Sequence, residues 1–326
     1  MVLVFGIVAL ATFAIGWYAS RYETLSEVAK NSAQPVRYSD PEFPLISPLV
    51  SIAIPNASGF PELKRVKSDV QNIIDDAKAR KAASDVGVYF RLPGNAHWFG
   101  INENDKFDPG SLIKVPIMMA LLKEAEIRPE ILQEKLTYNA NLDSDIPNAL
   151  KAQLPSGRYT VEKLLETMII NSDNVAKELL FDTAGETAVQ DVFDETNLNF
   201  LKDPSGTISP KSYIILFARI YSATYLDRYH SNYAMNLLSE TTYKDGLVAG
   251  LPEGIRVAHK YGESGIYEEN TLTTVELHDC GLVYVPNEPY NLCVMTKGKK
   301  TADLAQLIQD ISAAVYHDRL DFKPGN

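Results

Sequence analysis

The sequence predicts an α+β fold, because helix-type and strand-type segments occur in blocks along the chain. Apolar residues recur every three to four positions between residues 62 and 83 and in several segments between 111 and 240, which is the spacing of amphipathic helices. Runs rich in β-branched and aromatic residues flank that middle region, and a helical pattern closes the chain. The order helix, strands, helices, strands, helix is typical of α+β domains.

Local patterns predict the elements in turn. A helix is expected over residues 62–83, followed by strands over 86–92 and 97–101 that a Pro-Gly-Asn turn joins. In the middle region, helices are expected to open at or near four polar residues: Ser111, Thr160, Asn174 and Ser209. The last third returns to strands over 255–259, 277–285 and 290–296, before a final helix over 301–318.

Composition sets wide limits on function. The chain has 326 residues, of which 45% are hydrophobic, and a formal net charge of −11, so it can bury a large core in one or two domains. An acidic chain is a poor candidate for nucleic-acid binding, because neutralising phosphates requires a basic surface. The sequence contains neither a metal-ligand spacing nor a phosphate-binding glycine loop, so we predict no metal and no cofactor.

The first residues form an apolar stretch that contains no charge from Val2 to Ala19. At 1.5 Å per residue, such a helix just crosses a hydrocarbon core of ~30 Å, and Trp17 and Tyr18 suit a membrane interface. We interpret residues 1–20 as a transmembrane anchor, with a cleaved signal peptide as the alternative. Both interpretations place the rest of the chain outside the cytoplasm, either membrane-anchored or secreted.

Residues 21–61 are polar and interrupted by prolines, which is typical of a tether. The stretch 43–54 inside it is too apolar for a free linker, so we expect it to dock in extended form on the domain, which is predicted to span 62–326. Cys280 and Cys293 fall on neighbouring predicted strands. A disulfide in an oxidising compartment is one option for them, and two unpaired thiols are the other.

Ser111 and Lys114 form the first of three short motifs that suit acyl transfer. Ser111 is expected at the start of a helix, where free N–H groups and the positive helix end favour a developing anion. Residues three apart share a helix face, so the Lys114 amine can reach the Ser111 hydroxyl. Lys114 borders the apolar run 115–122 and must be desolvated or paired there. The simpler alternative is an N-cap serine with a solvated lysine.

The other two motifs are Ser172-Asp-Asn174 and Lys260-Tyr-Gly262. The Ser172 motif interrupts a helical pattern and on its own indicates a helix break with ordinary capping. The Lys260 motif is expected to end the strand 255–259, where glycine permits a close approach; its simpler interpretation is an edge-strand lysine beside a bulge. A competing Lys244-Asp-Gly246 carries a turn signal and is assigned to a loop.

In this order the three motifs resemble the Ser-x-x-Lys, Ser-Asp-Asn and Lys-Thr-Gly signature of the β-lactamase and penicillin-binding protein superfamily. The chain is most similar to class A β-lactamase-like serine hydrolases, from about residue 62 to the C-terminus. The resemblance implies an antiparallel sheet of about five strands, flanked by N- and C-terminal helices, with an all-helical lobe inserted at about 111–240. It also implies a catalytic groove between lobe and sheet.

The resemblance assigns catalytic roles to five side chains. Ser111 would be the nucleophile and Lys114 its base. Ser172 would relay a proton to the leaving nitrogen, and Asn174 would bind Lys114 and the substrate amide. Lys260 would hold the Ser172 hydroxyl polarised.

The resemblance also implies an oxyanion hole from the backbone N–H groups of Ser111 and Glu263, and substrate contacts at Tyr261 and Gly262. Tyr261 stands where the signature has threonine, so a phenol replaces a small hydroxyl. The stretch Glu195-Thr-Asn-Leu-Asn199 matches the letters of the family's Glu-x-x-Leu-Asn deacylation loop. It lies much closer to the Ser-Asp-Asn motif than in the family, so we interpret it as a helix end that runs into a turn.

His259, His278 and Asp279 could suggest a Ser-His-Asp triad. We interpret them as structural or surface residues, because His259 alternates to the opposite side of the strand from Lys260, and His278 and Asp279 are expected at a strand start.

The sequence therefore predicts a membrane-tethered, extracytoplasmic serine hydrolase that forms an acyl-enzyme on Ser111. Its substrate would be the amide of a β-lactam or of a D-alanyl peptide from the cell wall. The alternatives are a penicillin-binding protein with slow deacylation, a catalytically silent module that binds cell-wall peptide, and an ester-cleaving relative. Tyr261 and the missing family-spaced glutamate motivate the slow and silent alternatives.

Overall fold

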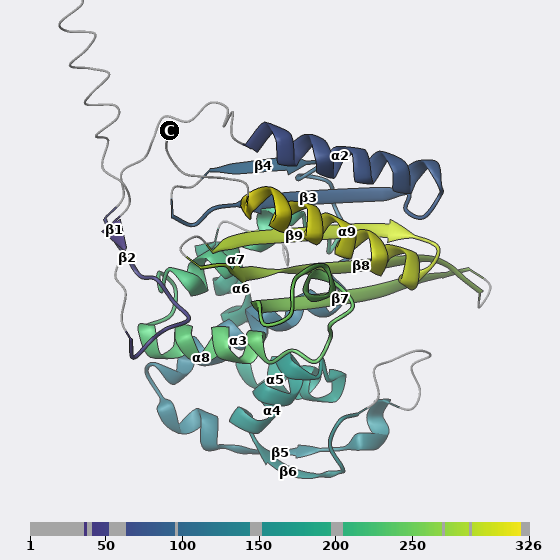
Figure 1. Ribbon diagram of the computed structural model, residues 1–326. Coiled ribbons are helices and arrows are strands. Elements are labelled where there is room, and N and C mark those ends of the chain that lie inside the picture. Colours follow the sequence, from purple (N-terminus) through teal and green to yellow (C-terminus); the bar gives the residue numbers. More distant parts are fainter. Residues whose placement is uncertain are drawn as a thin grey trace, which may run out of the picture.

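The computed structural model describes most of the chain beyond residue 62 and two short pieces before it (Figure 1). The described residues are 36–37, 41–51, 63–94, 97–143, 152–196, 205–268, 271–286 and 289–320. The predicted anchor at 1–20 and most of the predicted tether lie outside this set. Among the helices that are described, none combines the length and the apolarity needed to span a membrane.

Five antiparallel strands form the central sheet in the spatial order β4-β3-β9-β8-β7, which runs from top to bottom in Figure 1. They are β3 (Asp85–Arg91), β4 (Trp98–Ile101), β7 (Arg256–Glu268), β8 (Thr271–Tyr284) and β9 (Tyr290–Gly298). Because β3 pairs with β9, the sheet joins segments from before and after the helical region. The predicted α+β class and the five-stranded antiparallel sheet are confirmed.

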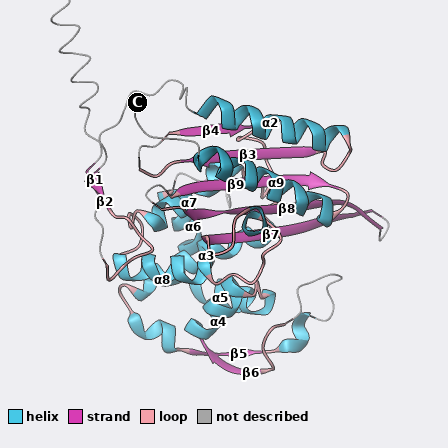
Figure 2. Ribbon diagram, in the orientation of Figure 1, coloured by secondary structure: helices cyan, strands magenta, loops and turns pink. Residues whose placement is uncertain are grey.

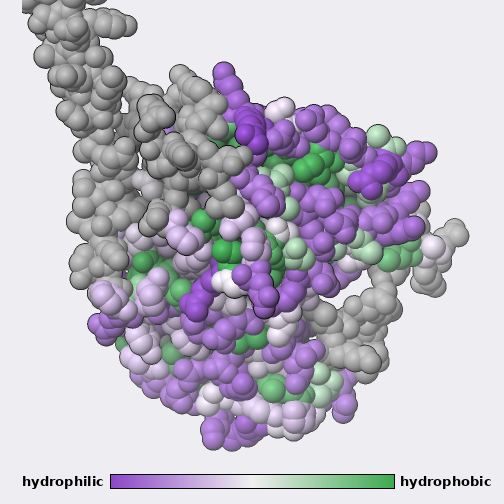
Figure 3. Space-filling model, in the orientation of Figure 1, coloured by the Kyte–Doolittle hydropathy of each residue, from purple (hydrophilic) through white to green (hydrophobic). Residues whose placement is uncertain are grey.

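One face of the sheet is covered by the first and last helices of the domain, α2 (Lys64–Ala79) and α9 (Thr301–Leu320) (Figure 2). The apolar stripe of α2 recurs at helical spacing and is buried: Val66, Val70, Ile74 and Ala77. The outer surfaces of the two helices are largely hydrophilic in Figure 3, so this layer has one apolar and one solvated side.

The other face carries the inserted lobe of helices. They are α3 (Lys114–Ala125), α4 (Val161–Ile170), α5 (Asn174–Ala184), α6 (Glu186–Glu195), α7 (Pro210–Tyr221) and α8 (Arg228–Ser239). The expected caps form, since Thr160 accepts a hydrogen bond from the Lys163 amide and Ser209 from the Ser212 amide. The lobe also contains a small two-stranded sheet of β5 (Lys135–Tyr138) and β6 (Gly157–Thr160).

Four single-turn 3-10 segments connect these elements: η2 (Gly110–Ile113), η3 (Pro129–Gln133), η4 (Ala140–Asp143) and η5 (Leu247–Gly250). The competing Lys244-Asp-Gly246 lies in the turn that precedes η5. Its assignment to a loop is confirmed.

Strands β7 and β8 are longer than the sequence patterns predicted, and two placements were wrong. Lys260-Tyr-Gly262 does not end a strand, because β7 continues to Glu268. Asp279 and its neighbour His278 do not start a strand, because β8 begins at Thr271. The extra length is a hairpin in which β7 residues after Glu263 pair with Thr271 to Glu276, and its mixture of polar and apolar residues hides the strand pattern.

Cys280 and Cys293 face each other across β8 and β9 and form a disulfide. Both side chains are fully buried in the core between the sheet and the lobe. The sequence had left this pairing open.

Residues 41–51 lie against the domain, and β2 (Leu49–Ser51) pairs with β1 (Val36–Arg37). Leu45 and Ile46 are buried in the lobe-side core. The Leu45 amide donates to Asn232 Oδ1 at 3.1 Å, and the Leu45 carbonyl accepts a hydrogen bond from the Tyr284 hydroxyl at 2.8 Å.

Candidate active site

Ser111 lies in the 3-10 turn η2, directly before α3, rather than in the α-helix itself. The turn is built from local chemistry: the Asp108 carboxylate accepts a hydrogen bond from the Gly110 amide at 2.8 Å, and the Pro109 carbonyl accepts one from the Leu112 amide at 3.0 Å. Gly110 has a φ of 49°, in the left-handed region that favours glycine. These two hydrogen bonds and the φ of Gly110 therefore fix the backbone conformation that presents Ser111.

Lys114 opens α3 with its side chain only 1% exposed. Its Nζ lies 2.8 Å from Ser111 Oγ and 2.7 Å from Asn174 Oδ1. It also lies 2.7 Å from the Ser172 carbonyl oxygen and 3.2 Å from Ser172 Oγ. A single buried amine thus connects the first and second motifs, which are 58 positions apart.

Ser172 occupies a tight turn between α4 and α5 and has a φ of 59°. Asp173 holds this turn: its Oδ1 caps α5 by accepting a hydrogen bond from the Ala176 amide at 2.7 Å. Its Oδ2 accepts one from the Tyr138 hydroxyl at 2.6 Å. Burial and the Asp173 carboxylate raise the pKa of Tyr138, so the phenol remains a donor. The helix break predicted from the sequence is therefore a fixed support for Ser172.

Lys260 reaches the same hydroxyl from the sheet. Its Nζ lies 2.8 Å from Ser172 Oγ and 3.0 Å from the Tyr261 carbonyl oxygen. Burial lowers the pKa of Lys260 well below its ordinary value, the nearby charge of Lys114 lowers it further, and Asp279 opposes them. The Ser172 hydroxyl consequently lies between two buried lysine amines.

Glycines let β7 approach the serine turn. A side chain on Gly262 would collide with the Pro109 carbonyl, and one on Gly110 would lie 2.5 Å from the Glu263 carbonyl oxygen and 3.0 Å from its nitrogen. The backbone directly before Ser111 therefore lies against the Glu263 backbone, and the oxyanion hole expected from the Ser111 and Glu263 amides would lie at this junction.

Tyr261 packs as one ring of an aromatic pair. It stacks on Tyr243 with the ring centroids 4.0 Å apart, and Lys260 Nζ lies 4.3 Å from the Tyr261 centroid. Only 9% of Tyr261 is exposed. The phenol is thus an integral part of the wall beside Lys260, and no local pattern predicts Tyr243 as its neighbour.

Two of the three residues that suggested a Ser-His-Asp triad, His259 and Asp279, pair with each other instead of with Ser111. His259 Nδ1 is 2.8 Å from Asp279 Oδ1, and Asp279 Oδ2 accepts a hydrogen bond from the Leu247 amide at 2.8 Å. This pair lies on the face of β7 opposite Lys260, fully buried. Their interpretation as structural residues is confirmed.

Glu195 is also remote from the motifs. It is the last residue of α6, followed by a turn, as predicted. It lines a pocket of about 360 Å³ together with Lys123 and Tyr225, at the end of α3 away from Ser111. Asn199 lies outside the described residues.

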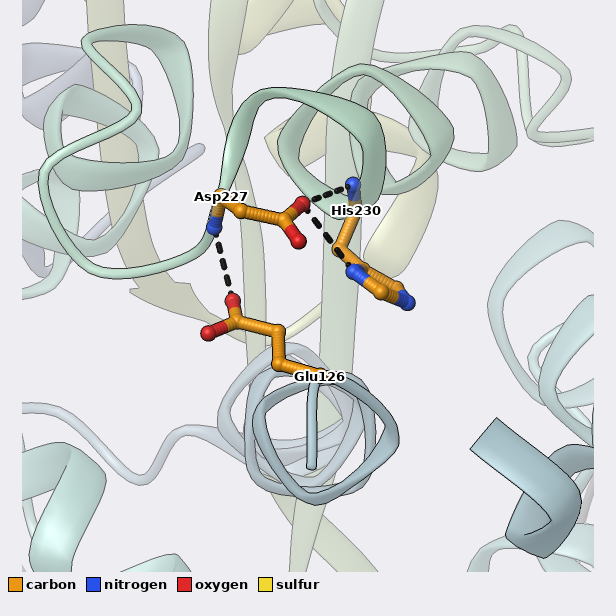
Figure 4. A group of neighbouring side chains, drawn as sticks. All are labelled: Glu126, Asp227 and His230. Atoms are coloured by element: carbon orange, nitrogen blue, oxygen red, sulfur yellow. Dashed lines mark hydrogen bonds and ion pairs between the residues drawn. The ribbon is translucent and has the colours of Figure 1, made fainter. Parts of the chain in front are cut away.

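One group of described residues has the donor set of a metal site: Glu126, Asp227 and His230 (Figure 4). Each carboxylate already has a structural task. Glu126 accepts hydrogen bonds from the Asp227 amide and from Lys123, and Asp227 caps α8 by accepting from the His230 amide. The cluster is therefore explained as a helix cap tied to the end of α3.

Two further side chains that support the site are not indicated by the motifs: Tyr138, which anchors Asp173, and Glu276, which binds the Asp108 amide. Glu276 and His278 alternate with Val275 and Leu277, both buried. Polar residues that share one face of a strand while apolar residues fill the other are a readable signal of a polar contact surface.

Known proteins are similar to this chain in sequence and in fold. A family model described as "Beta-lactamase enzyme family" matches residues 65–318. β-Lactamase VEB-1 of Pseudomonas aeruginosa is 22% identical over 273 residues, which cover 76% of this chain and 88% of that protein. Extended-spectrum β-lactamase PER-1 of the same organism is 26% identical over 252 residues, covering 71% and 79%.

Solved structures superpose on most of this chain. PBP-A superposes with a TM-score of 0.66 at 26% identity, covering 80% of this chain and 97% of that one. A mutant of PBP-A has been solved as an acyl-enzyme complex with penicillin G. TLA-1 extended-spectrum β-lactamase has a TM-score of 0.67 at 19% identity, covering 79% and 100%, and supports the fold.

Proposed function

The chain belongs to the β-lactamase enzyme family, and from this premise we propose that it cleaves an amide through an acyl-enzyme on Ser111. It is a serine hydrolase of the β-lactamase or DD-peptidase type. The observation that carries the proposal is the contact of Lys114 Nζ with both Ser111 Oγ, at 2.8 Å, and Ser172 Oγ, at 3.2 Å. The base is thereby within hydrogen-bond reach of both the nucleophile and the proton relay.

In the acylation step, Ser111 Oγ attacks the carbonyl carbon while its proton passes to Lys114. The amide N–H groups of Ser111 and Glu263 stabilise the negative oxygen that forms. Ser172 then gives its proton to the leaving nitrogen as the C–N bond breaks, and Lys114 returns its proton to Ser172. The products are the Ser111 ester and a free amine, which for a β-lactam stays attached to the acyl group.

The base must be uncharged to accept a proton, and the second lysine assists this. Two adjacent buried ammonium groups repel each other, so the pair loses one proton more readily than two isolated lysines. Because burial and the charge of Lys114 lower the pKa of Lys260, Lys260 is the member that is neutral at rest. The Ser172 hydroxyl lies 2.8 Å from Lys260 Nζ and 3.2 Å from Lys114 Nζ, and it provides a route by which Lys114 passes its proton to Lys260 when Ser111 reacts.

The proposed substrate is a β-lactam or a D-alanyl peptide, which have similar amide chemistry. Relatives named β-lactamase support the former, and a relative that forms an acyl-enzyme with penicillin G supports a penicillin-binding role. Slow deacylation is the second candidate, because Glu195 lies beside Lys123 and Tyr225 and supplies no water-activating group at Ser111.

The test combines covalent labelling with turnover. Wild type is expected to become labelled with a fluorescent penicillin and Ser111→Ala is not, while Ser84→Ala, an exposed serine-to-alanine control, is labelled like wild type. Nitrocefin turnover indicates a β-lactamase, and a stable adduct without turnover indicates a penicillin-binding protein. If neither occurs, the silent binding module is favoured. Equal labelling of wild type and Ser111→Ala would remove Ser111 from the mechanism.

We propose in addition that the enzyme acts outside the cytoplasm, held by residues 1–20. The disulfide between Cys280 and Cys293 supports an oxidising compartment, and the uncharged stretch supports an anchor. Carbonate-resistant membrane association of the full chain, together with cleavage by protease added from outside, is the expected result. Release as a shorter soluble protein would indicate a cleaved signal peptide instead.

A further inference from the structure

Two side chains of β8 bind the backbone of the segment that leads to Ser111. Glu276 Oε2 accepts a hydrogen bond from the Asp108 amide at 2.8 Å, and His278 Nε2 lies 2.8 Å from the Asp108 carbonyl oxygen. A carbonyl only accepts, so His278 Nε2 carries the hydrogen. Both backbone groups of Asp108 are thus held by strand residues 168 and 170 positions away in the chain.

The histidine is fixed in one tautomer by its second nitrogen. The Thr296 amide donates to His278 Nδ1 at 3.2 Å, so Nδ1 is the acceptor and Nε2 the donor. His278 is fully buried, and the Phe107 ring meets it edge-on with the ring centroids 5.5 Å apart. This imidazole therefore has a donor and an acceptor task and little freedom to change either.

The Glu276 carboxylate is held by its neighbours as firmly as the His278 ring. Glu276 is 5% exposed, and Lys297 Nζ lies 3.2 Å from its Oε1. Burial acts to raise the pKa of Glu276, but the nearby His278 ring, whose Nε2 lies 3.6 Å from Oε2, the Asp108 amide and Lys297 outweigh it and leave the pKa below its ordinary value. Glu276 stays ionised and remains a strong acceptor for the Asp108 amide.

Asp108 transmits this restraint to Ser111 within three residues. Its own carboxylate accepts from the Gly110 amide at 2.8 Å, and Gly110 lies against the Glu263 backbone. A displacement of Asp108 therefore moves Ser111 relative to both Lys114 and the proposed oxyanion hole. Misplacement of a reacting group by about 1 Å costs on the order of 10²-fold in rate.

We propose that Glu276 and His278 are positioning residues, which act through Asp108 to hold Ser111 in its reactive place. The inference rests on the proposed function, in which Ser111 is the nucleophile. Neither side chain contacts Ser111, so their effect is indirect and depends on the bond that each makes to Asp108.

A matched pair of substitutions separates this role from a general effect on folding. His278→Gln places an amide nitrogen near the Nε2 position and keeps the donor to the Asp108 carbonyl. His278→Asn places its amide near Nδ1, so it keeps a partner for Thr296 and loses the bond to Asp108. His317→Asn, at an exposed histidine of α9, controls for the chemical change alone.

Two measurements are made on the full chain: the rate of acylation by penicillin G, and hydrogen–deuterium exchange of residues 107–112. We expect His278→Asn to lower the limiting acylation rate at least tenfold at unchanged substrate affinity, and to speed exchange in this segment. His278→Gln should restore the rate to within about threefold of wild type. Glu276→Ala should resemble His278→Asn in both measurements.

The outcomes distinguish this inference from the proposed function. Equal acylation rates for the two His278 variants, or unchanged exchange at 107–112 in His278→Asn, would overturn the positioning role. If wild type is not acylated at Ser111, the proposed function fails, and exchange alone then decides whether Glu276 and His278 hold the segment. Loss of substrate affinity instead of rate would show that they act on binding and would also contradict the proposal.

Discussion

The two faces of β7 carry buried polar side chains in opposite electrostatic settings. On the lobe side, Lys260 meets the Ser172 hydroxyl at 2.8 Å and the charge of a second lysine, Lys114. On the other side, its sequence neighbour His259 is paired with the Asp279 carboxylate at 2.8 Å. Both side chains are fully buried, so burial does not distinguish them.

The two side chains differ in the charge of the neighbour that each one meets. The Asp279 carboxylate accepts hydrogen bonds from His259 Nδ1 and from the Leu247 amide, which suits a permanent structural contact. Lys260 faces a like charge and a hydroxyl that can give or take a proton, so its charged form is destabilised. We therefore expect the Lys260 face of β7 to take part in proton transfer and the His259 face to stabilise the fold.

The largest effect is expected for Lys114→Ala. Removing the base should lower the acylation rate by about 10²–10⁴-fold, because Lys114 is the amine within 2.8 Å of Ser111 Oγ. Stopped-flow acylation by a chromogenic β-lactam measures this. Circular dichroism verifies that the variant is folded, and a folded variant that acylates at the wild-type rate would break the proposed division between the two faces.

Asp279→Asn should act on stability and leave catalysis nearly unchanged. The neutral amide weakens the contacts to His259 and the Leu247 amide, at a cost of about 2 kcal/mol in the free energy of unfolding. Urea denaturation followed by tryptophan fluorescence gives this value. The acylation rate per folded molecule should stay within about threefold of wild type; a hundredfold loss would assign the pair to the reaction.

Lys260→Met should change how stability depends on pH. Burial, and then the charge of Lys114, lower the pKa of Lys260 in the folded protein, whereas an unfolded lysine titrates near 10.5. Between these values the unfolded chain binds a proton that the folded chain does not, so this lysine makes stability rise with pH across that window. The contribution is at most about 1.4 kcal/mol per pH unit for one proton.

Unfolding free energies of wild type and Lys260→Met between pH 7 and 10 test this. The difference, wild type minus variant, should increase as the pH rises, because the penalty for a buried charge disappears. A difference that is constant or falls with pH would mean that Lys260 remains protonated in the folded protein, like a paired surface lysine.

Tyr243→Leu should have the smallest effect. It removes the stacked partner of Tyr261, whose centroid lies 4.0 Å away, and should cost about 0.5–1.5 kcal/mol of stability. Thermal unfolding measures the cost. A change in substrate affinity of tenfold or more would place the aromatic pair in the substrate site instead of the supporting wall.

Local chemistry allowed much of this fold to be predicted. The caps at Thr160 and Ser209, the helix at Asn174 and the alternating strands near both chain ends follow from short-range patterns that the structure confirms. The length of β7 did not follow, because Ser264, Gly265 and Glu268 interrupt the strand pattern and this stretch forms a strand by pairing with β8.

The same distinction between short-range and long-range contacts applies to the candidate site. Ser111 and Lys114 are three apart, so their contact could be inferred from helix geometry. The bond between Glu276 and the Asp108 amide joins residues 168 positions apart, and the stacking of Tyr243 on Tyr261 likewise depends on the folded loop. Contacts of this kind are set by tertiary packing, which no local pattern encodes.

The most direct test of the acyl-enzyme on Ser111 is peptide mapping by mass spectrometry after an acid quench with penicillin G. Trypsin is expected to release residues 107–114, in which Ser111 is the only hydroxyl-bearing residue. We predict the added mass of one intact penicillin on this peptide in wild type. An adduct on another peptide, or β-lactam turnover with no adduct on this one at any quench time, would contradict it.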